Sequence, residues 1–147
     1  MPDSIFPFVQ PRVYTDADIP KTQALAVYRD VAWDFAANKP VFVRGEAVIV
    51  EGLPAVLSWA WRALHQERYV NELYTWGYGC ELPTLVGEQW MSETKIAEAE
   101  RYIREALAVS PYITGVTDVT AAFEEGTVTV AFVIQTIYGT SNMEVTL

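Results

Sequence analysis

Residues 113–138, ITGVTDVTAAFEEGTVTVAFVIQTIY, carry the pattern that decides the fold. The stretch predicts two strands, Ile113–Phe123 and Thr127–Tyr138, joined by a hairpin turn at Glu124-Glu125-Gly126. In the second strand, Val128, Val130, Phe132 and Ile134 alternate with Thr127, Thr129, Ala131 and Val133. Both faces of the second strand are rather apolar, so we expect it to be central in a sheet or covered on both sides. A final short strand is expected at Met143–Leu147.

Two helices are expected upstream of this hairpin. Glu51-Gly52-Leu53-Pro54 opens the first, because proline suits the first turn of a helix, and the apolar stripe fades near residues 65–68. The second helix begins near Ser92, a fair N-cap, and ends at Ser110-Pro111. On its charged face, Glu100 and Arg104 have the order that stabilises a pair four residues apart.

Three short apolar runs precede the first helix and predict a small antiparallel meander. They cover Val27–Phe35, Val41–Arg44 and Ala47–Val50, with turns between them. The sum is an α+β fold, in which a small antiparallel sheet (the N-terminal meander plus the C-terminal hairpin) packs with two main helices. No linker or internal repeat interrupts residues 25–147, so we expect them to form one domain.

Residues 1–24 differ in composition from the rest of the chain. Prolines at positions 2, 7, 11 and 20 interrupt any periodicity, yet large apolar residues occupy positions 5, 6, 8 and 9. The segment is interpreted as an extended N-terminal arm that docks on its own domain or on a neighbour. The alternative is a frayed terminus.

The charge balance disfavours two classes of partner. Ten basic residues against nineteen acidic ones give a formal charge of −9, whereas nucleic acid and anionic membranes require clustered Lys and Arg. No secretory signal or bilayer-spanning run is visible, so we expect a soluble protein of the cytoplasm, or of a particle assembled there. The one cysteine, Cys80, cannot form an internal disulfide, and the one histidine, His65, cannot form a two-histidine metal site.

A search for catalytic motifs leaves one enzymatic alternative open. The glycine-rich phosphate loops and the Gly-x-Ser-x-Gly elbow are missing from the sequence, so no cofactor, metal or small-molecule substrate is expected. His65 is interpreted as a solvated or dipole-paired side chain, and Cys80 as a small buried one. The alternative is a small lysozyme-like glycosidase that uses carboxylates of the segment 67–88. Glu67, Glu72, Glu81 and Glu88 lie in or near its aromatic residues, and aromatic rings commonly stack on sugars.

The aromatic segment 69–87, YVNELYTWGYGCELPTLVG, is weakly periodic. It predicts a loop or a short strand through Trp76, followed by one helical turn near residues 82–86. Its rings indicate either core packing or a protein–protein contact, because Trp and Tyr dominate interface hot spots.

Several short strings occur in an order and spacing that belong to a known family. They are Arg44-Gly45, Glu51–Val56, Glu67-Arg68-Tyr69, Tyr74–Leu82, Ala106–Ile113 and Val116-Thr117-Asp118. In these strings the chain resembles baseplate wedge proteins of contractile phage tails, of the sheath-initiator type, in the branch found in prophages and phages of Gram-positive hosts. The resemblance covers residues from about 27 to 140. The broader family has Glu-Pro-Arg where this chain has Ser110-Pro111-Tyr112. In other branches the Glu and the Arg of this string contact the wedge, and because this chain has neither, we do not expect that contact here.

The resemblance implies a structural, non-enzymatic protein of the virion (tail baseplate), assembled in the cytoplasm of the bacterial host. Its implied partners are baseplate wedge subunits and the tail sheath protein, with about six copies per baseplate. The first sheath ring would assemble on an open strand edge, for which Met143–Leu147 and Val41–Arg44 are the candidates. Whether the particle is a phage, a bacteriocin or another injection device stays open. The candidate interface residues are Glu67, Arg68, Tyr74, Trp76, Tyr78, Glu81, Pro111 and Tyr112.

Overall fold

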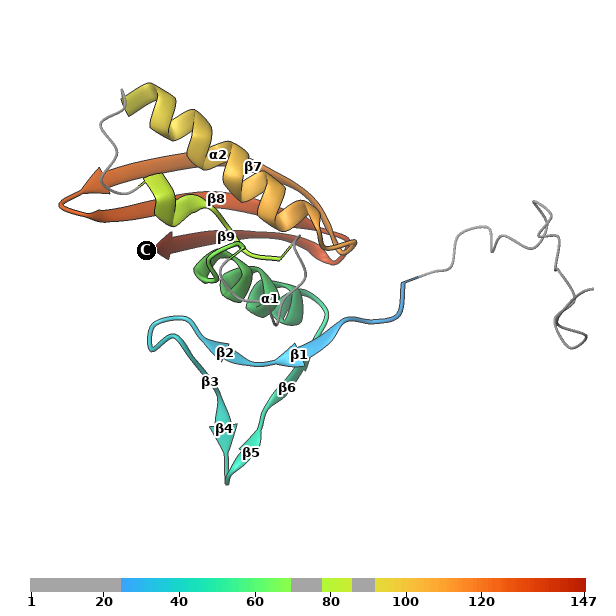
Figure 1. Ribbon diagram of the computed structural model, residues 1–147. Coiled ribbons are helices and arrows are strands. Elements are labelled where there is room, and N and C mark those ends of the chain that lie inside the picture. Colours follow the sequence, from blue (N-terminus) through green and yellow to red (C-terminus); the bar gives the residue numbers. More distant parts are fainter. Residues whose placement is uncertain (1–24, 70–77, 86–91) are drawn as a thin grey trace, which may run out of the picture.

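The computed structural model describes residues 25–69, 78–85 and 92–147 (Figure 1). The predicted arm, residues 1–24, lies outside the described residues. The division of the chain into an arm and one domain therefore stays a prediction.

The order of the elements confirms the predicted α+β class. In the described ranges, six very short strands come first, then two helices separated by a 3-10 turn, and then three long strands. The elements are β1 (Arg29–Val31), β2 (Trp33–Asp34), β3 (Lys39–Pro40), β4 (Phe42–Val43), β5 (Glu46–Ala47), β6 (Ile49–Glu51), α1 (Leu53–His65), η1 (Leu82–Leu85), α2 (Ser92–Ala108), β7 (Ile113–Glu124), β8 (Thr127–Thr136) and β9 (Gly139–Thr146).

The predicted hairpin forms two strands of an antiparallel sheet with the order β7-β8-β9. Strand β8 is central, as expected, but only one of its faces is fully covered. Alternate residues Val128, Val130, Phe132 and Ile134 are buried, whereas the residues between them are half-buried. The last strand begins four residues earlier than predicted and pairs with β8 along its whole length.

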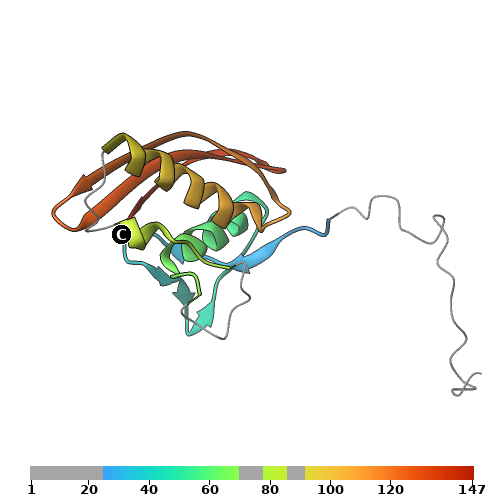
Figure 2. The same ribbon diagram turned by 45° about the horizontal axis from the view of Figure 1, so that its top comes forward.

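Both helices pack on the buried face of this sheet (Figure 2). Helix α2 lies over β7, and α1 lies between the sheet and the N-terminal strands. Because α1 is covered from two sides, it buries residues all round its axis. Ala55, Ala60 and Ala63 are fully buried, and their small side chains allow the backbones on both sides to approach closely.

The N-terminal strands do not form the predicted meander. They form three separate two-stranded ribbons, β1–β6, β2–β3 and β4–β5. The ribbons meet where Ala32, Val41 and Val48 close a ring of backbone hydrogen bonds. Ala32 N–H donates to Val48 at 2.7 Å, Val48 N–H donates to Val41 at 3.0 Å, and Val41 N–H donates to Ala32 at 2.9 Å. Each strand changes its partner at this junction, a long-range arrangement that local alternation does not encode.

Helix α1 holds the three-ribbon unit against the rest of the molecule. The Arg62 guanidinium forms an ion pair and hydrogen bond with the Asp30 carboxylate on β1. That carboxylate also accepts hydrogen bonds from the Tyr28 hydroxyl at 3.1 Å and from the Val31 N–H at 2.7 Å. Burial, reinforced by the Asp30 carboxylate, raises the pKa of Tyr28 to about 12.

Candidate protein interface

Four of the predicted interface residues lie where the chain leaves α1 and where it returns before η1. Residues Glu67 and Cys80 form a parallel bridge, in which Arg68 N–H donates to the Cys80 carbonyl at 3.3 Å and Cys80 N–H donates to the Gln66 carbonyl at 2.8 Å. This bridge brings Glu67, Arg68 and Glu81 together at one end of α1. Tyr78 is also in this region, where its ring meets Trp59 of α1 edge-on at 6.0 Å.

Arg68 is the charged centre of this group. Its side chain is 17% exposed and lies 3.9 Å from the Glu81 carboxylate and 3.7 Å from the Glu105 carboxylate of α2. The guanidinium also lies over the Tyr69 ring, 5.0 Å from its centroid. Ion pairs at these separations contribute little to the free energy of unfolding. They orient the Arg68 side chain between the loop and helix α2.

The other two candidates within the aromatic segment, Tyr74 and Trp76, lie outside the described residues. The choice between core packing and a protein contact for these rings therefore stays a prediction. The helical turn expected near residues 82–86 is present as η1, and it buries Leu82 and Leu85. This part of the segment thus contributes to the core.

Tyr112 serves an internal contact, and Pro111 beside it is exposed. The Tyr112 hydroxyl donates to the Ala26 carbonyl at 2.8 Å, and its ring lies 4.8 Å from Tyr28 and 6.2 Å from Tyr138. The Tyr138 hydroxyl in turn accepts the Tyr28 N–H at 3.0 Å. These three rings fasten the start of the ribbon unit to the connections at one end of the sheet.

Cys80 is buried, as the sequence predicted, whereas His65 is half-buried and its ring packs on Trp61 with centroids 4.4 Å apart. The Cys80 side chain is 1% exposed, and burial raises the pKa of its thiol to about 11. A buried thiol that stays protonated at neutral pH is a poor nucleophile. His65 lies in the last turn of α1, where Nδ1 is 2.8 Å from the Trp61 carbonyl.

Among the residues that the structure describes, no strand pairs with the outer edge of β9, and this edge is regular. The sequence indicated only part of it, at Met143–Leu147. Val128 and Leu147 exchange both backbone hydrogen bonds, so bonding to β8 continues at every second residue of β9. The intervening residues turn their N–H and C=O groups away from β8, and all four are exposed. These residues are Thr140, Asn142, Glu144 and Thr146.

The opposite edge of the sheet, β7, is irregular. Its register with β8 shifts between Ile113 and Gly115, and again between Thr117 and Thr120. Asp118, inside the second shift, has a positive φ of 54°. Bulges of this kind disrupt a row of backbone groups and protect an edge against pairing. The second sequence candidate, Val41–Arg44, contains strand β4, which is two residues long and pairs with β5 along one edge. Its other edge therefore offers a much shorter row of backbone groups than β9 does.

The described carboxylates give limited support to a sugar-cleaving site. Glu81 lies 3.9 Å from Arg68, and three hollows over the described residues are lined by residues other than Glu67 and Glu81. The other two acids of the segment, Glu72 and Glu88, lie outside the described residues. In the same described ranges, no group of three metal-ligating side chains gathers, and no helix has the length and apolarity to cross a membrane.

Comparison with known proteins agrees with the resemblance seen in the sequence strings. A family model for the contractile injection system sheath initiator matches residues 29–139. The phage-like element PBSX protein XkdS of Bacillus subtilis (strain 168) is 31% identical over 97 residues, which cover 65% of this chain and 69% of that protein.

Proposed function

This chain belongs to the sheath initiators of contractile injection systems, and on that premise we propose that it links the inner baseplate wedge to the first ring of the tail sheath. It starts the sheath by accepting a strand of the first sheath subunit on the open edge of β9. The loop around Glu67, Arg68, Tyr78 and Glu81 faces the wedge. The protein works in the virion, in about six copies per baseplate, after assembly in the host cytoplasm.

The contrast between the two sheet edges carries this proposal. Strand addition needs a straight row of N–H and C=O groups that point away from the sheet, and β9 supplies them at four alternate positions. Of these groups, the Asn142 carbonyl accepts the Ser141 hydroxyl at 3.4 Å, a bond that an incoming strand would replace. The strand has no Pro, Lys or Arg, and Glu144 is its one charged residue. Proteins usually protect an exposed edge with such residues or with bulges, and β7 shows two register shifts. An unprotected edge therefore favours a partner strand at β9.

A proline at an outward-facing position tests the edge directly. Asn142→Pro removes an N–H that β8 does not use, so the monomer should keep its fold while the incoming strand loses a donor. The asparagine N–H is retained in Asn142→Ala, which is the matched control. We expect Asn142→Pro to slow nucleation of sheath polymers by about ten-fold or more, measured by electron microscopy with the sheath protein of the same particle. Nucleation by Asn142→Ala should equal that of the wild type.

Glu144→Pro provides a second test at another outward-facing position of β9. Circular dichroism and urea unfolding identify which proline variant retains the native fold. If a folded proline variant nucleates sheath as fast as the wild type, strand addition at β9 is wrong.

The glycosidase alternative has its own assay. We propose that the chain breaks no bonds, and a peptidoglycan-clearing assay with purified protein tests this. Clearing that is lost in both Glu67→Gln and Glu81→Gln would establish a carboxylate-based glycosidase and contradict the proposal.

A further inference from the structure

The hairpin β4–β5 projects from the three-ribbon unit, away from the helices and the large sheet (Figure 1). Its side chains are exposed, with Phe42 at 59% and Val43 at 57%. The turn residues Arg44 and Gly45 have φ angles of 53° and 81°, as in the tight turns that match the twist of a two-stranded ribbon. A well-formed hairpin that exposes large apolar groups on both faces is typical of a contact surface.

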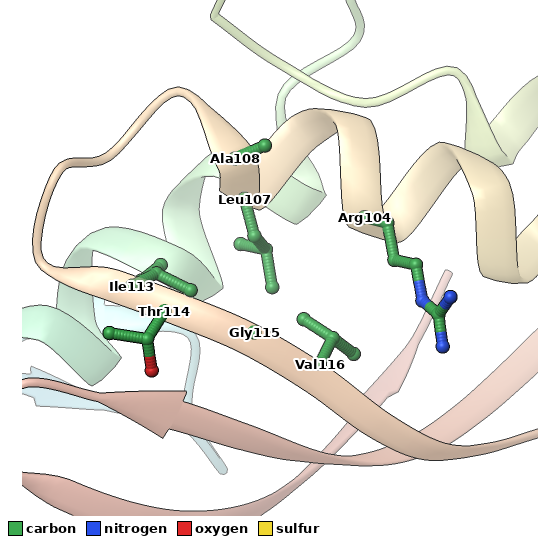
Figure 3. Close-up of a pocket in the computed structure, with 7 residues that line it drawn as sticks. All are labelled: Arg104, Leu107, Ala108, Ile113, Thr114, Gly115 and Val116. Carbon is green, nitrogen blue, oxygen red and sulfur yellow. The ribbon is translucent and has the colours of Figure 1, made fainter.

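The same chain has an apolar groove between the end of α2 and the start of β7 (Figure 3). It has a volume of about 390 Å³ and is lined by Leu107, Ala108, Ile113 and Val116, among others. In Figure 3, Leu107 descends from α2 toward β7, and Val116 lies on the strand below. Val109, the next residue after Ala108, is 46% exposed.

The charges around the two surfaces are complementary. Arg44 and Glu46 flank the tip of the hairpin, and both are exposed. At the rim of the groove, Arg104 lies 2.6 Å from Glu100 across one turn of α2. Arg104 and Glu100 already pair with each other, so a hairpin that enters the groove would exchange this pair for contacts of Glu46 with Arg104 and of Arg44 with Glu100.

We infer that the hairpin β4–β5 of one copy docks in the α2–β7 groove of a second copy, with Phe42 in the apolar pocket and Glu46 beside Arg104. The contact joins two different surfaces, so repeating it produces a closed ring or an open filament, not a two-fold dimer. It leaves the β9 edge unused. The inference therefore goes beyond the proposed function, and the failure of one leaves the other standing.

Disulfide trapping tests this arrangement. The double variant Glu46→Cys/Arg104→Cys should form a ladder of dimers, trimers and larger species on mild oxidation at high protein concentration. Each single variant has one new thiol and can reach only a dimer. A control pair, Glu46→Cys/Thr120→Cys, places the second thiol on the outer face of the sheet and should give no ladder above dimer.

Substitution of the hairpin tip provides a second readout. Phe42→Asp in the double-cysteine background should reduce the species larger than a dimer by about ten-fold or more, and its high exposure means that the monomer should stay folded. Val43→Thr is a milder change on the other face of the hairpin and should reduce the ladder less. The inference is overturned if the double variant gives no species larger than a dimer, or if the control pair gives the same ladder.

Discussion

The side-chain oxygen of Asn38 accepts a hydrogen bond from the indole N–H of Trp61 at 2.8 Å. The same oxygen accepts the indole N–H of Trp33 at 3.1 Å, and Asn38 has a φ of 49°. Phe35, in the same turn, stacks on Trp61 with ring centroids 4.9 Å apart. One asparagine at the turn between β2 and β3 thus locks this ribbon onto α1.

Replacing Asn38 with alanine should therefore loosen this attachment. The change removes the acceptor of two indole donors and disfavours the left-handed backbone, so we expect a loss of about 2 kcal/mol in the free energy of unfolding. Urea unfolding followed by tryptophan fluorescence measures it. Asn38→Asp keeps the acceptor and should stay close to the wild type. Equal stability of the alanine variant would show that the two hydrogen bonds contribute little.

Gly79 is required by a close approach of two backbone segments. It has a φ of 110°, and a Cβ there would lie 2.9 Å from the Gln66 carbonyl oxygen and 3.0 Å from Arg68 Cα. Gly79→Ala should thus lower the free energy of unfolding by about 3 kcal/mol, the sum of backbone strain and steric conflict.

Gly45→Ala is the matched control for this substitution. Gly45 also has a positive φ, of 81°, but no heavy atom lies within 4 Å of the Cβ position. Gly45→Ala should therefore lower the free energy of unfolding by only about 1 kcal/mol. If both alanine variants lose the same stability in urea unfolding, the contact of Gly79 with Gln66 is unimportant.

The buried thiol predicts a loss of stability at alkaline pH. The pKa of Cys80 is raised from its ordinary value of 9.0 to about 11, chiefly by burial. Because the pKa of the thiol is higher in the folded state, the protonated thiol makes its full contribution to the free energy of unfolding below about pH 9. That contribution decreases between about pH 9 and 11. Cys80→Ala should unfold with a shallower pH dependence over that interval in urea titrations. A slope identical to that of the wild type would contradict the assignment.

The ion pair between Arg62 and Asp30 should contribute more to the free energy of unfolding than the surface ion pairs of α2 do. Its side chains are 32% and 13% exposed, whereas Arg104 is 54% exposed in its pair with Glu100. We expect Arg62→Met to lower the free energy of unfolding by about 2 kcal/mol, because it leaves the Asp30 carboxylate half-paired. Arg104→Met should lower it by less than about 0.5 kcal/mol. Equal losses in urea unfolding would show that burial does not strengthen the pair.

Local pattern predicted the helices and the large sheet well. Pro54 lies in the first turn of α1, where the fixed backbone angle of proline suits a helix start. Both helices begin within a residue or two of the expected place. The Glu100–Arg104 pair also forms, because residues four apart on a helix always meet. The turn Glu124–Gly126 was found for the same reason, since a tight turn is decided by its own residues.

The site residues were harder to predict, because most of their roles depend on distant partners. Tyr112 is near Pro111 in sequence, but it contacts Ala26, 86 residues away. Arg68 meets Glu105 of α2 only because a parallel bridge folds the loop back at Cys80. The alternation of Thr140, Asn142, Glu144 and Thr146 was the available signal for a longer β9.

By itself, the sequence determined the α+β class, the positions of the two helices and the long hairpin, because propensity and alternation act between neighbours in the chain. Only the tertiary structure decided that the N-terminal runs form three ribbons around Ala32, Val41 and Val48, and not a meander. It also decided that β9 keeps a regular edge while β7 is bulged. Strand partners and edges depend on which distant segments the core brings together, and residue pattern does not record that choice.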